Sequence, residues 1–288
     1  MMKHIMVATD LSERSDRALR RATLLARQWD ADITLVNAVD EDRPRRIVEE
    51  ERREALSLLQ DMAATLRNID GVRCKVEVVL GEPSQAIIQV AAAMAPDLLV
   101  IGPHRRQLFR DIFIGTTAER TIRAASCPVL MVNAAPAAPY RHVLLTTDLS
   151  DGSRAAIAAY AGLGIAGTVA HSILHVFDAP LLGLALPAAM DERDRRLYIE
   201  EEGQKAALAL ETFCASTAVG SAKCFLRYEQ TTAKHEILSG AADVHADLIV
   251  LATHGKSGLQ KLLLGSVTEQ VLRDAAVDVL AIPPATAI

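Results

Sequence analysis

The residues with the clearest chemical potential lie in one segment, THGKSGLQKLLLGSV at residues 253–267. It contains Gly255-Lys256-Ser257, residue types that occur together in loops that bind phosphate. A Walker A loop reads G-x-x-x-x-G-K-[S/T] and would require glycine at position 250, where this chain has Val250. That loop also normally follows the first strand of its unit, whereas Gly255 follows the fourth apolar run of its half. The P-loop interpretation therefore fails on both counts.

A different phosphate site fits the same segment. The apolar run LIVLA at 248–252 predicts a strand, so Thr253, His254 and Gly255 follow its carboxyl end. Doubly wound sheets bind their ligands in the crevice beyond such strand ends. Glycine at 255 permits close approach of the backbone, and Lys256 can add a point charge.

The end of the segment predicts the start of a helix. Residues 266–269, SVTE, have the pattern of a capping box with Ser266 as the N-cap. The amides of Gly265, Ser266 and Val267 would then point, unpaired, into the crevice and attract phosphate together with the helix dipole. Across the crevice, Asp148 ends an earlier strand and can accept hydrogen bonds from ribose hydroxyls or a base.

Each of these residues also has a purely structural interpretation. Gly255 could be a turn, Ser266 an ordinary cap, and Asp148 the cap of a helix that starts at 151. The spacing of the whole set, rather than any one residue, favours the ligand site.

The chain contains this pattern twice because it repeats itself. KHIMVATDLSERSDRAL at 3–19 recurs as RHVLLTTDLSDGSRAAI at 141–157. DLLVIGPHRRQLFRDIFIGTTAERTIRAASCPVLMV at 97–132 recurs as DLIVLATHGKSGLQKLLLGSVTEQVLRDAAVDVLAI at 247–282. A repeat of this length indicates two copies of one structural unit.

The second copy is longer, and we place its extra residues around 181–196. Between the copies, AAPAAPY at 134–140 has the composition of a Pro/Ala linker. We therefore predict two domains, at 1–133 and 141–288.

Each half alternates short apolar runs with helical patterns. In the first half the runs are HIMVA, DITLVNAV, CKVEVVL, DLLVIG and PVLMV, as expected for a parallel sheet covered on both faces. Residues 18–29 carry an apolar stripe at helical spacing. This alternation predicts two doubly wound α/β units, each with a five-stranded parallel sheet. The final strands, PVLMV and DVLAI, would be exposed edges, so we expect them to pair with each other as an intrachain pseudo-dimer.

A small residue, two spacers, glycine, nine spacers and Gly-[Ser/Thr], with a strand-ending aspartate upstream, resembles the universal stress protein family pattern G-x2-G-x9-G-[S/T]. The resemblance covers essentially the whole chain twice and includes TTDLS and PVLMV. It implies Rossmann-like sheets of the adenine nucleotide alpha hydrolase-like type, with strand order 3-2-1-4-5. It also implies that ATP-binding members hold the nucleotide in this crevice, and that other members bind no ATP.

The second repeat keeps most of the family pattern. Gly255, Gly265 and Ser266 match, and Ala252 stands at the first glycine. The resemblance also implies that backbone groups at the end of the second strand, near Val176, contact adenine. The residues that we expect to bind nucleotide here are Thr147, Asp148, Val176, Ala252, His254, Gly255, Lys256, Gly265, Ser266, Val267 and Thr268.

The first repeat departs from the pattern at its middle glycine, which is Arg105. Arginine would crowd a position that needs close backbone approach or positive φ, although its guanidinium could instead reach a phosphate. We expect obstruction, and therefore one tight nucleotide per chain, held by residues 148–268. The weaker counterpart residues are Asp10, Gly102, His104, Arg105, Gly115 and Thr116.

Other residue groups indicate no further chemistry. His171 and His175 share one strand face, and packing explains them better than a metal does. RPRRIVEEERRE at 43–54 mixes charges as a solvated helix face does. The nearest approach to a catalytic set is Asp148 with His254, so we expect no enzyme beyond slow ATP hydrolysis.

The composition limits partners and location. The net charge of −5 and the pI near 5.9 produce no basic field for nucleic acid or membrane. No apolar run approaches the ~20 residues that span a bilayer, and the N-terminus is too short and too soon polar for a signal peptide. The four cysteines have no C-x-x-C spacing, so we expect neither a disulfide framework nor a zinc site, and a reducing cytoplasm.

The sequence thus favours a cytoplasmic stress-response protein that binds ATP or a related adenine nucleotide, with Mg²⁺ as an accompanying ion. A nucleotide-independent dimerisation or interaction module and a slow ATPase remain the alternatives. Any homodimer would use surface beyond the paired final strands.

Overall fold

The structure is a computed structural model that describes residues 2–103, 116–183, 190–254 and 264–284. The strands of the first repeat are β1 (His4–Ala8), β2 (Asp32–Val39), β3 (Cys74–Leu80), β4 (Leu98–Ile101) and β5 (Val129–Met131). Its helices are α1 (Glu13–Trp29), α2 (Arg45–Asn68), α3 (Pro83–Met94) and α4 (Thr117–Ala124).

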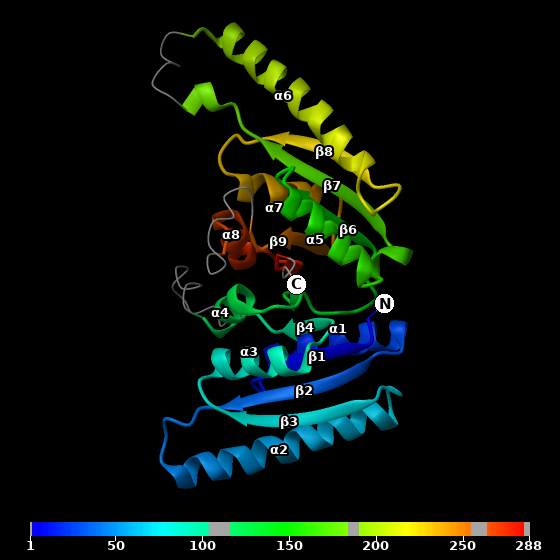
Figure 1. The fold of residues 1–288 in the computed structure, drawn as a ribbon, viewed down its shortest axis with the longest axis vertical. Coiled ribbons are helices and arrows are strands. Elements are labelled where there is room, and N and C mark those ends of the chain that lie inside the picture. The colour runs from blue at the N-terminus through cyan, green and yellow to red at the C-terminus, as the bar shows by residue number, and fades with distance from the viewer. Residues whose placement is uncertain (1, 104–115, 184–189, 255–263, 285–288) are drawn as a thin grey trace.

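The second repeat follows the same order (Figure 1). Its strands are β6 (His142–Thr147), β7 (Ala170–Phe177), β8 (Lys223–Tyr228), β9 (Leu248–Ala252) and β10 (Asp278–Ile282). Its helices are α5 (Asp151–Gly162), α6 (Glu192–Ala215), α7 (Ala233–Asp243) and α8 (Ser266–Asp274), with short 3₁₀ turns η1 (Ile165–Thr168) and η2 (Pro180–Gly183).

All ten strands form one sheet in the order β3-β2-β1-β4-β5-β10-β9-β6-β7-β8. Each repeat contributes five parallel strands in the predicted order 3-2-1-4-5. The predicted pairing of the final strands is confirmed, because β5 and β10 are antiparallel with Leu130 opposite Leu280. The two expected sheets are therefore continuous, and each repeat covers the other's edge.

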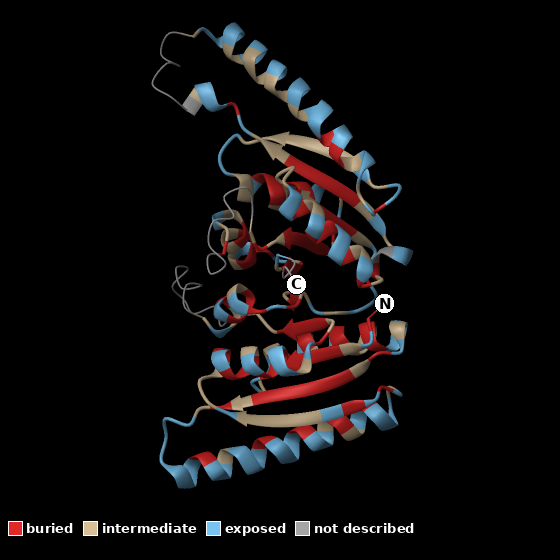
Figure 2. Cartoon of the chain, in the orientation of Figure 1, coloured by how far each residue is buried: buried red, intermediate tan, exposed pale blue. Residues whose placement is uncertain are grey.

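The strands are apolar on both sides because helices cover both faces of the sheet. In β1, Ile5 and Val7 belong to one buried cluster while Met6 and Ala8 belong to the other. Helices α1, α2, α5 and α6 supply the first cluster, and α3, α4, α7 and α8 supply the second. Figure 2 shows the buried strands between exposed helix faces.

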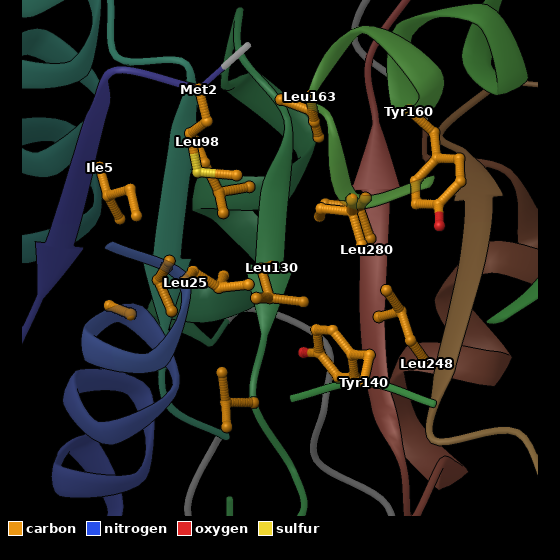
Figure 3. Close-up of a cluster of buried hydrophobic side chains, with 14 of the residues drawn as sticks. Met2, Ile5, Leu25, Leu98, Leu130, Tyr140, Tyr160, Leu163, Leu248 and Leu280 are labelled. Carbon is orange, nitrogen blue, oxygen red and sulfur yellow. The ribbon is translucent and has the colours of Figure 1, made fainter. Parts of the chain in front are cut away.

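The core crosses the junction between the repeats without a break. Leu130 of β5 and Leu280 of β10 lie in the same cluster, together with Tyr140 (Figure 3). Tyr140 is 5% exposed, so the end of segment 134–140 is fixed against the core rather than free. This segment therefore connects the repeats and also packs on the core through Tyr140, which its Pro/Ala composition did not indicate.

The extra residues of the second repeat lie where we expected them. Residues 178–191 connect β7 to α6, whereas only residues 40–44 connect β2 to α2. Figure 1 places α2 and α6 at opposite ends of the molecule, each beside an outermost strand.

The cysteines require a correction. Cys214 of α6 and Cys224 of β8 are joined as a disulfide, which their spacing did not predict. They meet because the chain turns directly from the end of α6 into β8. Cys74 and Cys127 are free and buried, and burial raises the pKa of each thiol to about 11. The expectation that the cysteines form no disulfide is therefore wrong for this pair, and the cysteines no longer favour a reducing compartment.

Within the described residues, no helix is both long enough and apolar enough to cross a bilayer.

Candidate functional site

The second repeat builds a sharp turn at the end of β6. Leu149 has φ 65°, in the left-handed region that a branched side chain adopts only under constraint. Thr147 holds it there, because its Oγ1 accepts from the Leu149 amide at 2.9 Å. Asp148 Oδ1 accepts from the Ser150 amide at 3.0 Å, and Ser150 caps α5 by accepting from the Ser153 amide at 3.2 Å. Asp148 therefore supports the turn, while the N-cap is Ser150.

This turn lies directly against the residues that follow β9. A Cβ atom added to Gly152 would lie 3.5 Å from the carbonyl oxygen of His254. The Thr253 amide continues the sheet by donating to Ile282 O at 2.9 Å, and the Thr253 hydroxyl lies 2.8 Å from His254 Nδ1. The carboxyl ends of β6 and β9 thus lie side by side, at the position where a doubly wound sheet is expected to have its ligand crevice.

His254 has one nitrogen without a partner. Its Nε2 is buried and makes no hydrogen bond to any residue that the structure describes. A buried polar atom in this condition costs free energy unless a further group meets it. The atom is therefore a candidate contact for a ligand in the crevice.

Helix α8 opens at the same crevice, with two corrections to the sequence expectation. The N-cap is Gly265 and no side chain caps the helix, so Ser266 is the first helical residue rather than a capping-box serine. The Gly265 amide donates to Thr253 O at 2.9 Å and is not available to a ligand. Thr268 is buried and fixes the first turn by donating its hydroxyl to Ala252 O at 2.9 Å. Ser266 is exposed and Val267 half-buried, and among described residues their amides donate to no backbone carbonyl.

The end of β7 lies beside the end of β6 in the sheet. His175 stands opposite Thr147 in the strand register and is 8% exposed. Its Nδ1 lies 2.9 Å from Thr147 O, so this histidine packs and fixes the strand end. Val176 follows it and is half-buried. The described residues contain no group of three or more metal-ligating side chains, and His171 instead lies 2.9 Å from the Tyr160 hydroxyl.

The first repeat has the same turn but a different partner for its aspartate. Leu11 has φ 60°, and Asp10 Oδ1 accepts from the Ser12 amide at 3.1 Å. Asp10 Oδ2 also forms a salt bridge of 3.3 Å with Arg14. Burial raises the pKa of Asp10, but hydrogen bonds from Ser12 and Ser15 and the charge of Arg14 outweigh it and lower the pKa.

Arg14 and Gly102 occupy the crevice of the first repeat in the way that Gly152 and Ala252 occupy the second. A Cβ on Gly102 would lie 3.1 Å from the carbonyl oxygen of Arg14, a tight contact that a larger residue could make only if the neighbouring backbone shifted slightly. In the second repeat, Gly152 stands at the position of Arg14, and Ala252 stands at the position of Gly102.

Helix α4 also differs from α8 at its start. Thr116 caps α4 by accepting from the Glu119 amide at 3.2 Å, as predicted. At the start of α4 the hydroxyl of Thr116 therefore already accepts one backbone N–H group, whereas no side chain accepts an N–H group at the start of α8.

Five predicted site residues lie outside the described residues. They are His104, Arg105 and Gly115 in the first repeat and Gly255 and Lys256 in the second. Sequence reasoning missed Arg14 and Gly152, although comparing RSDR with GSRA in the two repeats reveals the exchange.

Comparison with known proteins agrees with the fold and shows the family. The model of the universal stress protein family matches residues 1–133 and again residues 139–283, so the chain belongs to this family. A universal stress protein of Mycolicibacterium smegmatis is 25% identical over 299 residues, covering 97% of each chain. Universal stress protein MJ0531 of Methanocaldococcus jannaschii is 30% identical over 144 residues, covering 46% of this chain and 82% of the relative.

Solved structures show the same tandem fold. A universal stress protein from Archaeoglobus fulgidus superposes with a TM-score of 0.70 at 19% identity, covering 97% of this chain and 98% of the other. A protein from Pseudomonas aeruginosa UCBPP-PA14, described as a universal stress protein, gives a TM-score of 0.69 at 21% identity over 99% and 94%.

Proposed function

We propose that the second repeat binds ATP or a related adenine nucleotide, and that the protein acts in the cytoplasm in the response to stress. The observation that carries the proposal is the contact of Gly152 with the backbone of His254. Arg14, which pairs with Asp10, stands at the equivalent position of the first repeat, whereas Gly152 has no side chain.

The phosphates would lie at the start of α8. The Ser266 and Val267 amides and the helix dipole favour an anion there, and Lys256 would add a positive charge. His254 Nε2 is an orphaned polar atom on the same side and can donate to a phosphate oxygen when protonated. Mg²⁺ would be held by the phosphates, because the described residues gather no ligand set of their own.

The ribose and base would lie toward β6 and β7. Asp148 offers a carboxylate to hydroxyl groups, and Val176 offers backbone groups at the strand end. These assignments, like the division into domains 1–133 and 141–288, follow from the family pattern and the local geometry.

The first repeat favours a different outcome. Asp10 is already paired with Arg14. Thr116 already caps α4, the helix at whose start a phosphate would lie. Arg105 adds bulk to the loop at the family's glycine position. These features support one nucleotide per chain.

The pairing of β5 with β10 favours a second candidate function. Both repeats contribute to one continuous sheet, so a nucleotide-independent interaction module would need only this scaffold. We expect at most slow ATP hydrolysis, no nucleic-acid partner, and a homodimer only through further surface.

Calorimetry with ATP on the full chain distinguishes these functions. The substitution Gly152→Arg introduces the side chain that Arg14 has in the first repeat. It should weaken ATP binding by roughly tenfold or more, because one charge-assisted contact with the ligand would be lost. Gly162→Arg is the matched control in the same helix, because nothing lies within 4 Å of a Cβ there. Absence of ATP binding, together with no nucleotide in mass analysis of the purified protein, would favour the module instead.

A further inference from the structure

Helix α6 is attached to the sheet differently from its counterpart α2. Both helices have 24 residues, and each lies beside an outermost strand, α2 on β3 and α6 on β8 (Figure 1). In α2 five side chains are buried, namely Val48, Ala55, Leu59, Ala63 and Leu66. In α6, whose whole length the structure describes, only Leu210 and Phe213 are buried. Helix α6 therefore gains much less from apolar burial than α2 does.

The contacts that hold α6 gather at its C-terminal end. Leu210 and Phe213 both lie in the last two turns, and the Arg154 guanidinium of α5 lies 4.4 Å above the Phe213 ring. Toward the start of the helix an apolar side chain remains in solvent, since Leu197 is 49% exposed. The attachment of α6 thus depends on its final turns.

The disulfide lies at that same end. Cys214 of α6 is joined to Cys224 of β8 across a sequence separation of 10. Cys224 stands opposite Ile173 of β7, as Val76 of β3 stands opposite Leu35 of β2 in the first repeat. Valine at this position cannot form such a bond. A covalent link therefore fastens α6 to its strand, whereas buried side chains fasten α2.

The linked cysteines differ from the other two in their access to solvent. Cys214 and Cys224 are half-buried, whereas Cys74 and Cys127 are buried free thiols. Burial raises the pKa of each free thiol to about 11, so little reactive thiolate is present near pH 7. A reagent in solution therefore reacts with the Cys214–Cys224 bond in preference to the buried pair.

We propose that Cys214 and Cys224 form a reversible redox site, at which a small dithiol controls the attachment of α6 to β8. A thiolate of the dithiol forms an S–S bond with one Sγ atom, the Cys214–Cys224 bond breaks, and the released thiolate takes up a proton. The second thiol of the reagent then displaces the mixed disulfide. The reagent leaves as its own disulfide, having given two electrons and two protons to the cysteine pair.

Reduction changes what holds the helix. The closed loop between Cys214 and Cys224 restricts the opened state of the chain, so α6 opens more often once the bond is broken. Opening uncovers the face of β8 that carries Cys224 and Leu226, which pack against the same buried cluster as Leu210. The oxidised chain keeps this face covered, and the reduced chain exposes it.

Alkylation of the full chain under native conditions identifies the reactive cysteines. After oxidation with glutathione disulfide, mass analysis of a digest should show Cys214 linked to Cys224. After reduction with dithiothreitol, both should be alkylated at least about tenfold faster than Cys74 and Cys127. Failure of the pair to link on oxidation, or reduction only in denaturant, overturns the proposal.

Hydrogen exchange measures the attachment of the helix. Amides near Leu210 should exchange at least about tenfold faster in the reduced chain than in the oxidised chain, because the closed loop is lost. Helix α2 is the internal control and should exchange equally in both states. Removing dithiothreitol and adding glutathione disulfide should restore slow exchange in α6. Equal exchange of α6 in the two states, with reduction verified by mass, refutes the proposal.

Variants assign the effect to this bond. The double substitution Cys214→Ser and Cys224→Ser should give the fast exchange of the reduced chain with or without dithiothreitol. Ala215→Ser, at an exposed position beside Cys214, is the matched control and should keep the response to dithiothreitol. A response of α6 to dithiothreitol in the double variant contradicts the assignment. The reduced unmodified chain provides the same comparison without any substitution, and none of these measurements requires a nucleotide, so they are independent of the proposed ATP site.

Discussion

Arg21 of α1 donates its Nε–H to Asp278 Oδ2 at 3.1 Å and thereby joins the first repeat to the last strand of the second. Both side chains are almost fully buried, and the Arg21 guanidinium also lies 3.9 Å above the Tyr140 ring. Tyr140 donates to the same carboxylate oxygen at 2.6 Å. The two repeats are therefore held together by a polar cluster as well as by the β5–β10 pair.

Removing Arg21 should destabilise the protein strongly. Arg21→Met leaves the Asp278 carboxylate buried without its cation, which costs about 3–5 kcal/mol. Chemical denaturation measures the loss, and Arg20→Met, at an exposed position in the same helix, is the control with an expected change below about 0.5 kcal/mol. Similar effects of the two variants would contradict the importance of the buried pair.

The loss of unfolding free energy caused by Arg21→Met should depend on pH. Burial raises the pKa of Asp278 above 3.8, although Tyr140 and Arg21 oppose the shift. A carboxyl group with a raised pKa in the folded state contributes stability at low pH that is lost as pH rises through that pKa. Without Arg21 the pKa rises further, so the destabilisation should be larger at pH 7 than near pH 4. Equal losses at both pH values would show that Asp278 does not titrate in this range.

Opening the first repeat should create a second nucleotide site. Arg14→Gly removes the partner of Asp10 and copies Gly152, and Arg105→Gly restores the family glycine. The double variant should bind two ATP per chain by equilibrium dialysis, whereas the unmodified chain should bind one. Glycine in the first turn of α1 should cost about 1 kcal/mol at most, so folding is preserved. Two equivalent sites before substitution would refute the asymmetry.

Lys256 should strengthen phosphate binding without supporting the fold. Losing a charge-assisted contact costs about 1.5–3 kcal/mol, so Lys256→Ala should weaken ATP binding by roughly ten- to a hundredfold. Lys261→Ala is the control for a general effect of positive charge in this segment, and it should weaken ATP binding less than Lys256→Ala does. An unchanged affinity for Lys256→Ala would remove this lysine from the site.

The sequence predicts the sheet well because most of the inner strands are nearly continuous apolar runs, and because both repeats show the same order of elements. HIMVA, DITLVNAV and CKVEVVL coincide with β1, β2 and β3. Such runs mark strands whatever lies around them, provided that both faces are covered.

The site is less predictable, because its details depend on atoms brought together by the fold. Ser266 has the residue type of a cap, yet the chain enters α8 one residue earlier, at Gly265. The disulfide between Cys214 and Cys224 was likewise not predicted, because it depends on how the end of α6 lies against β8. No local pattern carries these relationships.

The antiparallel contact between β5 and β10 lies within a single chain. Two separate subunits would exchange partners and come apart on dilution, at a rate and to an extent set by their concentration. Here the two halves associate within one chain. Their effective concentration is set by the seven-residue connection 134–140 and does not depend on how much protein is expressed. Each molecule therefore always contains one copy of each half, so the two crevices can diverge in sequence without ever forming a mismatched pair.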